Sequence, residues 1–132
     1  MRRLSPSSRG CICAVVVASA AAALPGTATA GSLAFKHCRS ADLRYPFEQG
    51  GPNTFGVFKL KISNGRCRTA HRVAKEWMDR FEANLDEGRV KLPKHVRGFT
   101  FKSLPPTAAQ TYNLRGRKGE TTIRFDYVVP NG

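Results

Sequence analysis

The chain has 132 residues, of which 22 are Lys or Arg and nine are Asp or Glu, giving a formal net charge of +13. This length provides for one domain and leaves little room for a second core. The positive excess favours anionic partners and says nothing about the fold. The sequence contains no phosphate-binding loop, dinucleotide fingerprint or Gly-x-Ser-x-Gly motif, so no cofactor bound through such a motif is expected.

Residues 1–30 have the pattern of a cleavable secretion signal peptide. Three arginines and no acid are followed by a small-and-apolar run over residues 11–24 and by the small-x-small pattern Ala28-Thr29-Ala30. A membrane anchor is the alternative, but the run is shorter than the roughly 20 residues needed to span a bilayer. We therefore predict a mature domain over residues 31–132 that is secreted, either extracellular or associated with the cell envelope. It would carry 19 cations and nine acids, a net charge of +10.

Two of the four cysteines, Cys38 and Cys67, remain after the predicted cleavage. A pair of cysteines in an oxidising compartment is expected to form a disulfide. The sequence therefore predicts one disulfide bond between them.

The first half of the mature chain predicts two strands separated by a long connection. Leu33, Phe35 and His37 alternate with other residues in a short strand that ends at Cys38. Residues 39–53 are rich in Pro and Gly, which is typical of a loop. Residues 58–62 alternate between apolar and basic side chains and predict a half-buried strand. Phe55 and Val57 fall on the opposite parity, which predicts a bulge near Gly56.

Residues 67–85 change to a helical period. Their apolar side chains fall within one arc of an α-helix, with charged residues opposite, and Gly88 is the expected stop. After a basic linker over 89–98, strands are predicted at 99–103, 112–114 and 123–127. The predicted fold is α+β, with one amphipathic helix packed on a small antiparallel sheet of about four to five strands and one disulfide.

One set of positions resembles a known group of proteins. The positions are Cys38, Val57, Leu60, the run Gly65-x-Cys67-x-x-Ala70-x-x-Val73-x-x-x-Trp77, and Gly98-Phe99. This pattern resembles small, secreted, functionally uncharacterised proteins of actinobacteria. The resemblance implies the fold and the export route, and it implies no chemistry. Members of that group usually carry a second cysteine pair, where this chain has Phe101 and Leu114; an apolar contact is expected in its place.

Catalytic and metal sites find little support in the sequence. His37, Cys38, Cys67 and His71 could form a zinc set. However, neighbouring residues of a strand point to opposite sides, and export favours the disulfide. Glu76 and Asp79 each have a cation at ion-pair spacing on the helix, which indicates a solvated face. We therefore predict no catalytic, metal or cofactor-binding residues and no enzymatic activity, with a cryptic hydrolase as the remaining enzyme alternative.

The start of the helix breaks a local rule. Helix N-termini favour acidic side chains and C-termini favour basic ones, yet Arg66, Arg68 and Arg72 begin this helix while Glu82, Asp86 and Glu87 end it. Free backbone N–H groups beside guanidinium groups suit a phosphate, sulfate or carboxylate. These three arginines are therefore the predicted anion-binding residues; long side chains that extend into solvent are the structural alternative.

These observations predict a secreted, non-enzymatic binding domain. Its partner would be an anionic cell-envelope polymer such as a teichoic acid, a lipid head group or an acidic protein. The alternative is an inhibitor or effector that acts on a secreted protein through residues 39–53, which contain Tyr45-Pro46-Phe47. A nucleic acid partner is not expected because the chain is exported and shows no stacking motif.

Overall fold

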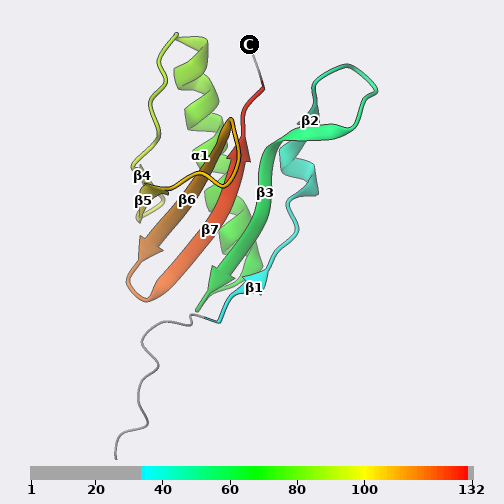
Figure 1. Cartoon of the computed structure of the whole chain (residues 1–132). Coiled ribbons are helices and arrows are strands. Elements are labelled where there is room, and N and C mark those ends of the chain that lie inside the picture. Colours follow the sequence, from blue (N-terminus) through cyan, green and yellow to red (C-terminus); the bar gives the residue numbers. More distant parts are fainter. Residues whose placement is uncertain (1–33, 131–132) are drawn as a thin grey trace, which may run out of the picture. The chain divides into compact units, whose positions relative to one another are not determined.

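The computed structural model describes residues 34–130, so the signal-peptide prediction for residues 1–30 lies outside the described part. Figure 1 shows one long helix lying along a twisted sheet. The elements in chain order are β1 Lys36–His37, a 3₁₀ turn Ala41–Leu43, β2 Arg44–Pro46, β3 Asn53–Ser63, α1 Cys67–Asp86, β4 His95–Val96, β5 Phe99–Leu104, β6 Thr111–Lys118 and β7 Thr121–Val128.

All strand pairs are antiparallel, in the order β1-β3-β7-β6-β5-β4, and β2 also pairs with β3. The predicted α+β class, with one helix on one antiparallel sheet, is confirmed. The sheet has more strands than the predicted four to five, because the short strands β2 and β4 were expected to be loop. A strand of two or three residues is too short to show a period of two.

The apolar side of α1 packs on one face of the sheet. Ala70, Val73, Ala74, Trp77 and Phe81 of the helix are buried, and the Trp77 ring lies 5.4–6.5 Å from three aromatic rings of the sheet, at Phe101, Phe125 and Tyr127. The helix ends at Asp86, one residue beyond the predicted range, and Gly88 follows with φ +75°. Trp77 is fully buried and so belongs to the core.

Strand β3 contains a bulge, but the parity of its side chains changes at a different residue from the one predicted. The pairing with β7 shifts between Phe58 and Lys61, and Lys59 has φ +55°. This extra residue places both Val57 and Leu60 on the core face and leaves Phe58 half-buried. Gly56 has another role: a Cβ there would lie 2.1 Å from the carbonyl oxygen of Leu43, so only glycine permits this close approach.

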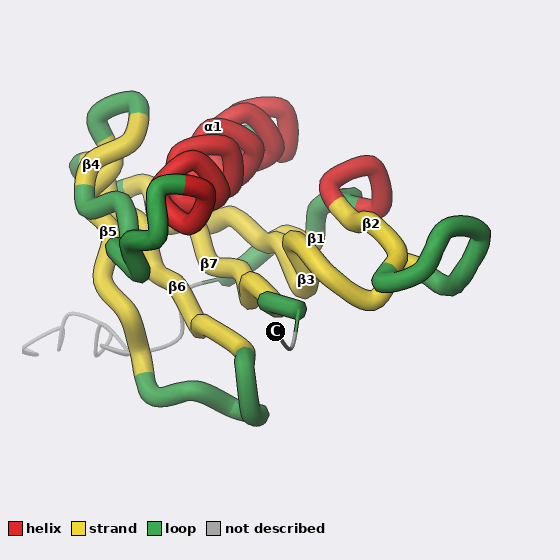
Figure 2. Tube along the Cα trace, turned by 90° about the horizontal axis from the view of Figure 1, so that it is seen from above, coloured by secondary structure: helices red, strands yellow, loops and turns green. Residues whose placement is uncertain are grey.

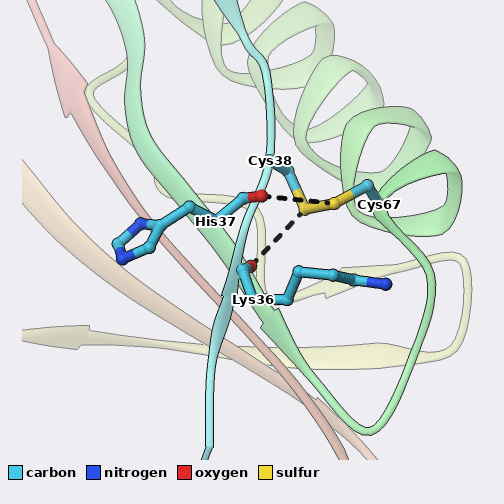
Figure 3. Close-up of a disulfide and its surroundings, with 4 residues drawn as sticks. All are labelled: Lys36, His37, Cys38 and Cys67. Atoms are coloured by element: carbon cyan, nitrogen blue, oxygen red, sulfur yellow. Dashed lines mark hydrogen bonds between the residues drawn. A yellow bond between two sulfur atoms is a disulfide. The ribbon is translucent and has the colours of Figure 1, made fainter.

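The predicted disulfide is confirmed. Cys38 and Cys67 are joined, with their Cα atoms 5.3 Å apart, so the first residue of α1 is tied to the chain immediately after β1. In Figure 3 the bond lies between the helix and this edge strand. The two sulfurs also contact the carbonyl oxygens of Lys36 and His37 at 3.6 and 3.5 Å.

The sheet has one face covered by the helix and one face without a helix among residues 34–130. Figure 2 shows α1 on one side of the strands only. Strand residues alternate between the two faces, and the face covered by α1 carries most of the core: Leu60, Ile62, Phe99, Phe101, Leu114, Ile123, Phe125 and Tyr127. We call the other side the open face. Both faces are built entirely from residues 34–130.

Candidate functional site

The three predicted anion-binding arginines all lie at the start of α1 and are exposed. Arg66 is the N-cap residue, and its side chain makes no capping hydrogen bond. Among residues 34–130, none of the three forms an ion pair. The first turn contains no acid and the last turn no base, which confirms the reversed charge distribution predicted along the helix.

Arg72 lines a groove together with residues from two other parts of the chain. The groove has a volume of about 400 Å³ and is lined by Thr69, Arg72, Val73, Arg97, Phe99 and Lys118. We call it the basic groove. It joins the side of α1 to the β4–β5 hairpin and to the end of β6. The structure therefore brings together Arg72 and Lys118, which lie far apart in the sequence, whereas Arg66 and Arg68 are outside the lining.

Arg97 is a groove residue that sequence reasoning missed. It occupies the first position of a two-residue turn between β4 and β5, with φ +48°, and Gly98 follows with φ +84°. Positive φ at both positions is the type I′ hairpin turn, which favours Asn or Asp before Gly, so arginine there is unusual. The signal that could have found it is the pair Arg97-Gly98 between the apolar residues Val96 and Phe99.

The same turn positions the other charges of the groove. Arg97 Nη1 donates to Glu76 Oε2 at 3.2 Å, and Glu76 also accepts from Arg80. The Lys118 side chain passes close to Gly98, where a Cβ would lie 3.1 Å from Lys118 Cε. Lys118 Nζ lies 5.9 Å from the centre of the Phe99 ring. One carboxylate therefore faces Arg97, whereas Arg72 and Lys118 have no acidic partner within the described residues.

The basic cluster Arg115, Arg117 and Lys118 is divided by the sheet. Lys118 shares the parity of Leu114, which belongs to the core, so it lies on the helix side. Arg115 and Arg117 have the other parity and lie on the open face. Of these three cations, Lys118 alone lies on the same side of the sheet as the arginines at the start of α1.

The residues of the possible zinc set are not brought together. Both sulfurs are used in the disulfide, and the His37 ring points away from it (Figure 3). His71 Nε2 lies 2.6 Å from Asp42 Oδ2. Within residues 34–130 no three His, Cys, Asp or Glu side chains are grouped as metal ligands would be.

A second cavity, of about 490 Å³, lies near the last turns of α1 and is lined by Tyr45, Glu82, Leu85, Asp86, Val129 and Pro130. Beside it, the hydroxyl of buried Tyr127 donates to Glu82 Oε1 at 2.6 Å and lies 3.5 Å from the Tyr45 hydroxyl. Burial, together with the hydrogen bond to Glu82, raises the pKa of Tyr127 well above its usual value. Burial also raises the pKa of Tyr45. These phenols are therefore structural donors that stay protonated.

Within residues 34–130, no helix combines the length and the apolar character needed to cross a bilayer. Comparisons of the chain with protein-family models, with curated proteins and with solved structures find no match.

Proposed function

We propose that this protein is a secreted, non-enzymatic binding domain whose basic groove takes an oxyanion group of a partner. The observation that carries the proposal is the convergence of Arg72, Arg97 and Lys118, from three separate parts of the chain, on one groove. Arg66 and Arg68 lie at the same end of α1 and would add positive potential around it. The disulfide is compatible with secretion.

The groove offers the donors that a phosphate, sulfate or carboxylate group needs. Arg72 supplies a planar guanidinium that can form two parallel hydrogen bonds, Lys118 supplies an ammonium, and Thr69 supplies a hydroxyl. Val73 and Phe99 provide an apolar wall, which strengthens charge-assisted hydrogen bonds by excluding water. The partner would be an anionic envelope polymer or an acidic protein that presents such a group.

Arg97 contributes in a different way. Its ion pair with Glu76 neutralises part of its charge, so it supports the groove less strongly than the two unpaired cations do. A residue held in a sparsely populated conformation often indicates a functional constraint. Here the turn holds a guanidinium at the mouth of the groove that an Asn in the same turn would not provide.

The test is a pull-down from culture fluid and from cell wall with the processed protein (residues 31–132) as bait. We compare it with Arg72→Glu/Lys118→Glu and with the control Lys75→Glu/Lys91→Glu, which reverses two charges outside the groove. The proposal predicts partners that bind the processed protein and the control, are lost from the groove variant, and elute in 0.5 M salt, as screening requires. Equal capture by the groove variant would refute it.

One observation favours the inhibitor alternative. Residues 47–52 form the tip of the β2–β3 hairpin, and the side chain of Phe47 is 64% exposed there. An exposed aromatic residue on a hairpin is a typical anchor for a protein partner. Under this alternative, Phe47→Ala abolishes binding of a secreted target protein and leaves the melting temperature nearly unchanged. A target protein that the Phe47→Ala variant binds as tightly as the unmodified protein does would exclude the hairpin as the binding site.

A further inference from the structure

The open face carries a line of cations that no motif in the sequence indicates. Lys61 of β3 is paired with Arg124 of β7, Arg124 with Arg115 of β6, and Arg115 with Lys102 of β5. Each of four adjacent strands therefore contributes one positive charge at the same level of the sheet. His37 of β1 extends this line at its outer end, since it pairs with Lys61. We call Lys61, Arg124, Arg115 and Lys102 the cation row.

This arrangement is unfavourable for the isolated fold. Like charges directly opposite each other on neighbouring strands destabilise a sheet, and here three successive pairs do so. Among residues 34–130 none of the four cations has an ion-pair partner; the nearest acid along the strand, Asp126, contacts Lys59. Arg124 Nε is buried and forms no hydrogen bond within the described residues. A row of like charges that costs stability and has no acidic partner among residues 34–130 indicates that a ligand supplies the missing negative charge.

The shape of the row decides what kind of anion fits. Neighbouring strands are about 4.8 Å apart, so the row spans about 14 Å in a straight line across the strands. A single phosphate reaches only two neighbouring members, whereas a linear chain with a charge on every repeat meets all four. We propose that the open face binds a linear phosphate-bearing polymer, which lies across the strands along the cation row.

Other partners fit the open face less well. Among the described residues the exposed large apolar side chains are Phe47 and Val90, and neither lies on a strand of the open face. Protein interfaces and membrane surfaces both rely on exposed apolar anchors. Single-stranded nucleic acids need aromatic rings for their bases. Near the row, the Phe35 ring has Lys61 Nζ 4.9 Å from its centre, and the half-buried Phe58 ring has Arg44 Cζ 4.3 Å from its centre. A polyanion backbone needs only charge.

The cation row lies on the other side of the sheet from the basic groove, so the two sites can be tested separately. We measure binding of long-chain inorganic polyphosphate and of triphosphate to the processed protein, to the row variant Arg115→Gln/Arg124→Gln, and to the control Lys75→Gln/Lys91→Gln, whose residues lie outside both the row and the groove. Both variants lose two charges, so net charge is matched. The row variant should bind polyphosphate about tenfold more weakly, and the control should bind it as the unmodified protein does.

Two further readouts and a second row variant sharpen the test. With four phosphate contacts, the slope of log K against log salt should be about −2.8, and the row variant should lose about half of it. The row variant should melt no lower than the unmodified protein at low salt, because like charges have been removed. If the row variant melts lower, it is replaced by Lys61→Gln/Lys102→Gln, which removes the charges at the two ends of the row. This second row variant should lose the same polyphosphate affinity.

The proposal is overturned by any of three results. The first is that both row variants bind polyphosphate as tightly as the unmodified protein does. The second is triphosphate bound as tightly as the long chain. The third is a tighter, row-dependent association with an oligothymidine or with anionic phospholipid vesicles at equal phosphate. Failure of the groove proposal leaves a different pattern, since Arg72→Glu/Lys118→Glu would then retain the partners captured from cell wall.

Discussion

Removing the disulfide tests how the small domain holds its helix against the sheet. In the double variant Cys38→Ser/Cys67→Ser the unfolded chain gains the freedom of a loop with a sequence separation of 29 residues. In the chain-entropy model this freedom is worth about 3.6 kcal/mol. That is a large share of a net stability that is of order 5–15 kcal/mol for a typical domain. The variant should therefore fold at 25 °C with a much reduced margin.

The expected change is measured by calorimetry or by circular dichroism during heating. At about 4–8 °C per kcal/mol for a domain of this size, the melting temperature should fall by about 14–29 °C. The unmodified protein in reductant should melt with the double variant, which serves as the control for the serine substitutions themselves. A fall of less than about 4 °C, or free thiols in the processed protein as isolated, would refute the reasoning.

Three other substitutions have defined outcomes. Tyr127→Phe should lower the free energy of unfolding at pH 7 by about 1 kcal/mol. Because the pKa of Tyr127 is raised in the folded state, the stabilisation by its hydroxyl is complete below pH 10 and is lost as the pH rises further. Urea denaturation should therefore show the difference in unfolding free energy between the two proteins closing above pH 10. Gly116→Ala places a Cβ 2.6 Å from the Phe101 ring and should cost about 1–3 kcal/mol in the same assay; an unchanged midpoint would contradict the packing. Arg97→Asn keeps a residue suited to the turn, so stability should change by less than about 1 kcal/mol while anion binding in the basic groove weakens; equal binding would remove Arg97 from the site.

Local patterns in the sequence were sufficient to predict the long elements. The period of 3.6 residues located α1 from Cys67 to within one residue of its end, and the cysteine pair identified the disulfide. The helical period depends only on residues near one another in the sequence, and the disulfide prediction depends only on counting the cysteines. The bulge of β3 was misplaced because alternation over residues 58–62 looks regular in the sequence. Only the pairing with β7 shows that Lys59 is the extra residue.

The candidate sites depended on information of a different kind. The reversed charge at the start of α1 was visible in the sequence and led to Arg72. Its neighbours in the groove, Arg97 and Lys118, required knowledge of how the β4–β5 hairpin packs beside the helix. The cation row could not be predicted because alternation assigns a residue to a face, whereas register between strands decides which residues are opposite one another. Arg115 and Arg124 became neighbours only through that register.

The most direct measurement is an amide NMR titration of the processed protein with inorganic phosphate at low ionic strength. Saturable shifts should concentrate at Thr69, Arg72, Phe99 and Lys118, the lining of the basic groove. They should disappear in Arg72→Gln/Lys118→Gln while the rest of the spectrum is retained. Shifts spread evenly over the surface, or unchanged in that variant, would contradict the assignment of the groove as an oxyanion site.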